Sequence, residues 1–150
     1  MSKVLTVGTF DLYHAGHVNL IFQCAKISGM FTINNRADQW HNVTVGLNSD
    51  KFVEKYKGKR PIYTYDERYK LLLNNRYVWN ILTNDTPTIE PLLKLEFDFL
   101  VIGSDWAQKD YYKQIGVDQN WLDKHGITLC YVPYTQGVST TQLKERINAS

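Results

Sequence analysis

The chain has 150 residues, of which 43% are hydrophobic and 21% charged, and a formal net charge of +2 at pH 7. This length is typical of one globular domain, which we expect to cover residues 1–150. The small net charge does not indicate nucleic-acid binding, and no apolar run reaches the roughly 20 residues of a membrane-spanning helix. The first residues enter a strand pattern directly, without a secretory signal. We therefore expect a cytoplasmic protein with no nucleic-acid partner and no membrane insertion.

Five apolar runs rich in β-branched and aromatic residues predict five strands. In chain order they are Val4–Val7, Val43–Leu47, Val78–Leu82, Phe97–Ile102 and Ile127–Val132. Helical patterns lie between or after them, at His17–Ser28, Asp66–Asn75, Pro87–Leu95, Asp118–Lys124 and Thr140–Ile147. The residues that suit the N-caps of the last four helices are Thr64 or Asp66, Thr86, Asp118 and Ser139.

This alternation of apolar strands with helices predicts an α/β fold, a single-domain, Rossmann-like, doubly wound parallel sheet of five strands. Two segments, Met30–Asn42 and Ala107–Gly126, are longer than such connections require. The sequence leaves their role open between lids, oligomer contacts and decoration.

Ligands of such sheets bind at the carboxyl ends of the strands, near the point where the strand order reverses. Polar or glycine-containing segments follow four of the predicted strands. They are Gly8–His17, Asn48–Asp50 with the basic residues after it, Gly103–Trp106 and Tyr134–Thr141. We therefore expect these four segments to meet at one edge of the sheet.

The segment Gly8–His17 has the properties of a phosphate-binding turn. Gly8 allows close approach of the backbone to a ligand, and the helix that follows starts with unpaired N–H groups. His14 and His17 are three residues apart and share one helix face, and a side chain at Gly16 would block a phosphate. A metal site is the alternative, but only Asp11 lies near enough in sequence to add a ligand. We assign no metal ligand to the protein.

The positive charge is concentrated in one segment that follows the second strand. Its basic residues are Lys51, Lys55, Lys57, Lys59 and Arg60. Gly58 lies among them, so we expect a glycine-containing loop that closes over a ligand. A solvated turn is the structural alternative.

Three of these segments resemble the sequence blocks of the cytidylyltransferase family, which belongs to the nucleotidyltransferases with an H-x-G-H motif. They are G-T-F-D-L-Y-H-A-G-H at 8–17, G-S-D-W at 103–106 and T-Q-G-V-S-T-T at 135–141. The resemblance implies transfer of CMP from CTP to a small phosphorylated alcohol, with glycerol 3-phosphate as first candidate and ethanolamine phosphate, choline phosphate or a sugar phosphate as alternatives. Pyrophosphate and a CDP-alcohol would be the products. It also implies Mg²⁺ carried with the triphosphate, and a homodimer with a contact near Arg76–Val78.

The resemblance also implies a role for individual residues. Catalytic roles fall to His14, His17 and Lys57. Nucleotide binding falls to Gly8, Thr9, Phe10, Asp11, Gly16, Gly103, Asp105, Thr135, Gly137, Ser139 and Thr140. Substrate binding falls to Arg60, Arg68 and Trp106, although Arg68 also suits a surface ion pair on its helix. A phosphate monoester is mostly dianionic at pH 7 and needs little help from a general base, so we expect the histidines to be hydrogen-bond donors rather than nucleophiles.

Two positions depart from the family pattern. Ser104 stands where the family more often has an acid, and Tyr134 stands where it commonly has an arginine. The missing cation could come from Lys109 or Lys113. Two other functions stay open: an adenylyltransferase of the FAD or dinucleotide type, and a non-catalytic nucleotide-binding regulatory protein.

Overall fold

The computed structural model describes residues 2–29, 42–93, 95–103, 110–133, 135 and 137–150. Its sheet has five strands in the order β3-β2-β1-β4-β5, and every neighbouring pair is parallel. The strands are β1 Val4–Gly8, β2 Val43–Asn48, β3 Asn80–Asn84, β4 Phe99–Gly103 and β5 Thr128–Val132. This confirms the predicted parallel α/β sheet.

Seven helices lie in the described part of the chain. They are α1 Ala15–Ile27, α2 Asp50–Lys57, α3 Tyr65–Leu73, α4 Glu90–Leu93, α5 Tyr111–Ile115, α6 Gln119–Lys124 and α7 Thr140–Ala149. The caps Thr64, Asp118 and Ser139 are confirmed, because each side chain accepts a hydrogen bond from its first helical turn. Among these helices, none is long and apolar enough to cross a membrane.

Three expectations about the helices were wrong. The predicted helix Pro87–Leu95 forms only over Glu90–Leu93, and the Thr86 hydroxyl donates to the carbonyl of Thr88 instead of capping a helix. The other two errors are omissions, since α2 and α5 lie where a loop and a segment of open role were expected.

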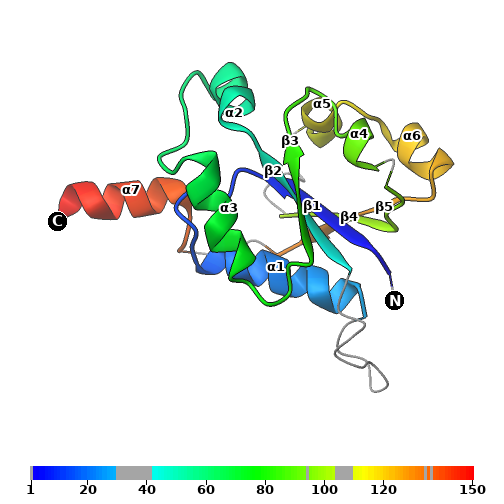
Figure 1. The fold of residues 1–150 in the computed structure, drawn as a ribbon, viewed down its shortest axis with the longest axis horizontal. Helices are drawn as coiled ribbons and strands as arrows, with labels where there is room; N and C mark the ends of the chain where they lie inside the picture. The colour runs from blue at the N-terminus through cyan, green and yellow to red at the C-terminus, as the bar shows by residue number, and fades with distance from the viewer. Residues whose placement is uncertain (1, 30–41, 94, 104–109, 134, 136) are drawn as a thin grey trace.

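Helices cover both faces of the sheet, as Figure 1 shows, with α1 and α3 on one side and α4, α5 and α6 on the other. Successive strand residues point to opposite faces. Val4 therefore packs in the core with Ile21 of α1, and Leu5 packs in the other core with Leu122 of α6. The helix α7 extends away from the sheet and has no buried residue.

A cleft opens where the strand order reverses, between β1 and β4. Along β1 the pairing with β2 runs from Val4 to Gly8, whereas the pairing with β4 is restricted to Val4 and Leu5. The two strands diverge toward their carboxyl ends, so backbone and side chains there are free to face a ligand.

Candidate active site

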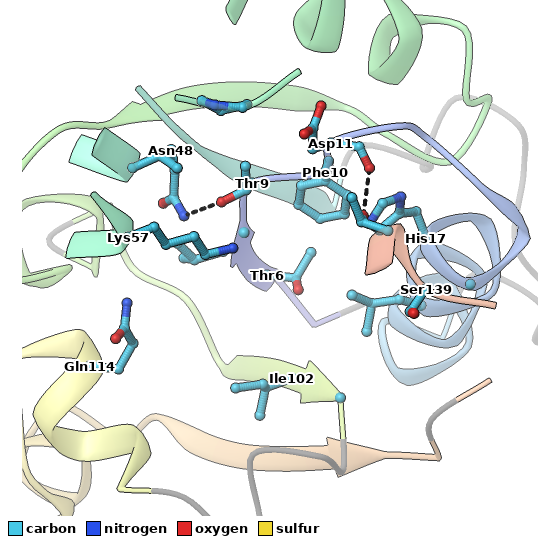
Figure 2. A pocket seen from close by; sticks show the side chains of 18 of the residues that line it. Thr6, Thr9, Phe10, Asp11, His17, Asn48, Lys57, Ile102, Gln114 and Ser139 are labelled. Atoms are coloured by element: carbon cyan, nitrogen blue, oxygen red, sulfur yellow. Dashed lines mark hydrogen bonds between the residues drawn. The ribbon is translucent and has the colours of Figure 1, made fainter. Parts of the chain in front are cut away.

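A cavity of about 720 Å³ lies at the carboxyl edge of the sheet. Figure 2 looks into it, with His17 and Ser139 at one end and Asn48, Lys57 and Gln114 at the other. Most of the predicted site residues line it: Gly8, Thr9, Phe10, Asp11, His14, Gly16, His17, Lys57, Arg60, Gly103, Thr135, Ser139 and Thr140. Gly137 and Arg68 are not among the lining residues. Asp105 and Trp106, like Ser104, Lys109 and Tyr134, lie outside the described residues.

The two histidines of the β1–α1 turn form the N-terminal cap of α1. His14 is the N-cap, and its Nδ1 accepts a hydrogen bond of 3.0 Å from the backbone N–H of Gly16. The Nδ1 of His17 accepts one of 3.2 Å from the backbone N–H of His14. In a neutral imidazole with Nδ1 as acceptor, the proton is on Nε2. The backbone therefore fixes both rings as Nε2–H donors.

Both imidazoles are held in the neutral form. Burial lowers the pKa of His14. The pKa of His17 falls to about 3, because burial disfavours the imidazolium and because a charge on His14 would repel it. The rings stack with centroids 3.7 Å apart. At neutral pH the pair thus offers two uncharged donors and no general acid.

The glycines at this turn make room for aromatic rings. A Cβ at Gly16 would lie 2.8 Å from Cε1 of His14, and one at Gly8 would lie 3.0 Å from a ring carbon of Phe10. We expected Gly16 to keep the helix start open to a phosphate. In the structure, the missing side chain of Gly16 leaves room for the His14 ring.

The β1–α1 turn has a strained backbone and is held by hydrogen bonds to two other segments. Phe10 and Leu12 have φ angles of 52° and 48°, in the left-handed region that residues with a Cβ rarely adopt. The Asp11 carboxylate accepts backbone hydrogen bonds of 2.8 Å from Ile62 and 2.9 Å from Tyr63. The Thr140 hydroxyl donates to the Asp11 carbonyl at 2.9 Å. Asp11 thus joins the turn to the segment before α3, and Thr140 joins it to α7.

The basic segment after β2 is mostly the helix α2, which corrects the predicted loop. Ser49 caps its start by accepting from the N–H of Phe52, and Gly58 ends it with a φ of 78°. Ser and Gly at these positions are ordinary start and stop signals. Lys57 is the last helical residue, and its side chain points into the cavity (Figure 2).

Arg68 is completely buried and does not reach the cavity, contrary to both sequence interpretations. Its guanidinium donates to three backbone carbonyls and one carboxylate. The acceptors are the carbonyls of Thr9, Asn48 and Tyr63 and the Asp50 side chain, the last at 2.7 Å. The side chain therefore ties the ends of β1 and β2 together beneath the site.

Sequence reasoning missed several residues that line the cavity. The main polar ones are Tyr56, Asn84, Gln114 and Lys144, whereas Asn48 belongs to a segment that was expected at this edge. Gln114 lies on α5, whose limits were readable from Asp110, its N-cap, and Gly116, which ends it with a φ of 74°. Lys144 lies on α7, so it supplies a cation at the histidine end of the cavity. Lys113, one of the cations expected there, does not line it.

The described residues do not offer a protein-held metal site. They contain no group of three or more His, Cys, Asp or Glu that could hold a metal ion. Asp11 is the one carboxylate among the described lining residues, and backbone N–H groups already occupy both its oxygens.

The geometry suits two phosphate-bearing ligands at once. At one end, the imidazole donors face the start of α7, where a helix N-terminus favours anions. At the other end, the cations Lys57, Lys59 and Arg60 line the cavity. Arg60 also forms an ion pair of 2.8 Å with Glu54. The Arg60 side chain is 59% exposed and the Glu54 side chain 50% exposed, so water screens this pair.

Comparisons with known proteins agree with this geometry. The Cytidylyltransferase-like family model matches residues 5–146. The glycerol-3-phosphate cytidylyltransferase of Bacillus subtilis (strain 168) is 32% identical, over 98% of each chain. The FAD synthase of Korarchaeum cryptofilum (strain OPF8) is 30% identical over 80% of this chain and 69% of its own.

A solved structure shares the fold. The lipopolysaccharide core biosynthesis protein from Thermoplasma volcanium GSS1 has a TM-score of 0.63 at 22% identity, over 90% of this chain and 97% of its own. The family match covers nearly the whole described fold, including both ends of the cavity. The chain belongs to the cytidylyltransferase-like family of nucleotidyltransferases.

Proposed function

We propose that the protein is a cytoplasmic cytidylyltransferase that transfers CMP from CTP to a small phosphorylated alcohol, with glycerol 3-phosphate as first candidate. Pyrophosphate and a CDP-alcohol are the products. The observation that carries the proposal is the pair of backbone-fixed Nε2–H donors facing three cations across one cavity. The relative from B. subtilis, named for this reaction and similar over its full length, supports the choice of substrates.

The reaction is an in-line displacement at the α-phosphorus of CTP. A phosphate oxygen of the acceptor forms the new P–O bond, and the bond from the α-phosphorus to the bridging oxygen breaks, which releases pyrophosphate. Negative charge grows on that bridging oxygen and its neighbours, and positioned donors stabilise it. The acceptor is already mostly dianionic at pH 7, so no side chain has to remove a proton.

In this proposal the histidines donate to the triphosphate and remain neutral throughout. Lys57 and Arg60 offset the repulsion between the acceptor phosphate and the triphosphate. The start of α7, with Ser139 and Thr140, holds phosphate oxygens through its backbone N–H groups. Magnesium enters as part of the nucleotide complex, because the described residues offer it no ligand set.

A homodimer is part of the proposal. Leu73 and Trp79 are 57% and 53% exposed on either side of Arg76–Val78, the segment predicted to lie near the contact. A second copy of the chain would cover both apolar side chains. Light scattering should report a dimer for the natural chain and a larger monomer fraction for Trp79→Ser, and a monomeric natural chain would contradict the prediction.

An adenylyltransferase is the second candidate, favoured by the similarity to an FAD synthase over 80% of this chain. A pyrophosphate-release assay distinguishes the two. CTP and ATP are each tested with glycerol 3-phosphate, ethanolamine phosphate, choline phosphate and flavin mononucleotide. We expect release with CTP and a phosphorylated alcohol. Release only with ATP would replace the proposal by the second candidate, and CTP binding without any release would favour a non-catalytic protein.

A further inference from the structure

The end of the cavity away from the histidines is built from segments that are far apart in sequence. α2 contributes Lys57, the ends of β2 and β3 contribute Asn48 and Asn84, and α5 contributes Gln114. Figure 2 shows Gln114 pointing across the cavity toward the Lys57 side chain, with Asn48 close to Thr9. In the proposed function the triphosphate binds at the histidine end, and the phosphate of the acceptor binds at this end, where Lys57, Lys59 and Arg60 line the cavity.

Two of the amides form a directed chain of hydrogen bonds. The Asn84 Nδ2 donates to Asn48 Oδ1 at 2.8 Å, and the Asn48 Nδ2 donates to Thr9 Oγ1 at 3.1 Å. The Thr9 hydroxyl in turn shares a hydrogen bond of 3.3 Å with the Tyr56 hydroxyl. Asn84 is 3% exposed, and its Oδ1 has no hydrogen-bond partner among the described residues. Because this oxygen is itself buried, the amide pair shapes the wall of the cavity and is not a group that a ligand reaches.

Gln114 adds a third amide, whose side chain forms no hydrogen bond with the described residues. Its carbonyl oxygen and NH₂ group are both open to a ligand. An amide can accept from one hydroxyl and donate to another, which suits a chain with neighbouring hydroxyl groups.

This end of the cavity has no carboxylate to pair with a positive charge, among the described lining residues. The nearby acids are already engaged: Asp50 pairs with Arg68, Asp85 accepts from Ser49, and Glu54 pairs with Arg60. Lys57, Lys59 and Arg60 would instead repel an ammonium group. The positive charge of these three side chains therefore disfavours amino-alcohol phosphates.

We propose that Gln114, in the part of the cavity whose wall the Asn48–Asn84 amide pair shapes, recognises the free hydroxyl groups of a neutral polyol phosphate and so determines the acceptor. Lys57 neutralises the phosphate of the same molecule. This rests on the proposed function and adds to it the residues that choose between neutral and cationic acceptors.

The test measures KM and kcat for glycerol 3-phosphate and ethanolamine phosphate, with saturating CTP, in the natural chain and in variants of Gln114. Gln114→Leu removes both hydrogen-bonding groups and should raise KM for glycerol 3-phosphate about tenfold, with KM for CTP unchanged. Gln114→Glu introduces a carboxylate that attracts an ammonium group. It should lower the ratio of kcat/KM for glycerol 3-phosphate over ethanolamine phosphate at least about tenfold.

The control variant is Asn120→Leu, which removes an exposed amide on α6 outside the cavity and should leave all constants unchanged. A loss of activity of Gln114→Glu toward both acceptors in equal proportion would overturn the proposal, since it would indicate a structural role for α5. A natural chain that uses ethanolamine phosphate as well as glycerol 3-phosphate would also overturn it. The absence of any CTP-dependent pyrophosphate release would instead reject the underlying function.

Discussion

The two ends of the cavity differ in how firmly the protein holds their polar side chains before a ligand binds. At the histidine end, the Nδ1 atoms, the Asp11 carboxylate and the Thr140 hydroxyl all have partners in the protein. At the amide end, Gln114 has none and Asn84 leaves its Oδ1 unpaired, among the described residues. A triphosphate is the same in every nucleotide and can be met by a rigid arrangement. The acceptor differs between enzymes, and in our proposal the free amide of Gln114 recognises it.

Replacing His17 tests the rigid end and has the largest expected effect. His17→Ala should lower kcat about 100-fold to 1,000-fold, because it removes a donor to charge that develops during the reaction. His17→Asn is the sharper variant, since its Oδ1 can replace Nδ1 as acceptor for the His14 N–H while the Nε2–H is lost. Compared with His17→Ala, it should have a higher free energy of unfolding in urea but the same low kcat in steady-state kinetics. Recovery of kcat in His17→Asn would contradict the donor role.

Replacing Arg68 tests whether its buried hydrogen bonds hold both ends of the cavity in place. Arg68→Met should lower the free energy of unfolding by about 3 kcal/mol, because it leaves the Asp50 carboxylate and buried carbonyls without their donor. Urea unfolding measures the loss. Among molecules that remain folded, KM for CTP and KM for the acceptor should both rise. An increase confined to the acceptor would argue against a support common to both ends.

Replacing Lys57 tests the amide end alone. Lys57→Met should raise KM for the acceptor about tenfold, as expected for the loss of a hydrogen bond from a charged group. Lys55→Met is the matched control, because Lys55 is exposed on the same helix and does not line the cavity. Steady-state kinetics with each substrate varied in turn separates the effects. Equal effects of the two variants would show that only the general charge of α2 matters.

The pH dependence of stability belongs to the histidine end. The unfolded chain protonates His17 near pH 6.5, whereas the folded chain does so only near pH 3. Between these values the unfolded state binds more protons, so stability falls as pH falls, by about 1.4 kcal/mol per pH unit for this group. Above pH 6.5 the contribution is constant. Urea unfolding from pH 4 to 7 should show a shallower slope for His17→Asn, and an unchanged slope would contradict a buried neutral His17.

The histidine end was largely predictable from sequence because its contacts are local. His14, Gly16 and His17 lie within one turn, and Ser139 with Thr140 marks a helix start by ordinary capping rules. The strands were predictable for the same reason, from short apolar runs. The helix α2 was not predicted, although Ser49 and Gly58 mark its start and its end.

The amide end was not predictable, because it depends on which distant segments meet. Asn84 follows β3, and Gln114 lies on a helix of five residues in a segment of open role. Neither carries a motif, and they share a cavity only through the strand order of the sheet. Arg68 was misread for a related reason, since burial behind the site is a property of the tertiary fold.

The histidine cap of α1 has a consequence for large-scale mutagenesis. Both rings cap the start of a helix through Nδ1, and in the proposed function both donate to the ligand through Nε2. Each side chain would then affect both the stability of the fold and the rate of the reaction. Substitutions at His14 and His17 should therefore lower the score both in a variant library scored for cellular abundance and in one scored for turnover. Substitutions at Lys57 should lower the turnover score alone. A comparison of the two sets of scores would distinguish residues of the histidine end from residues of the amide end without any structure of a bound ligand.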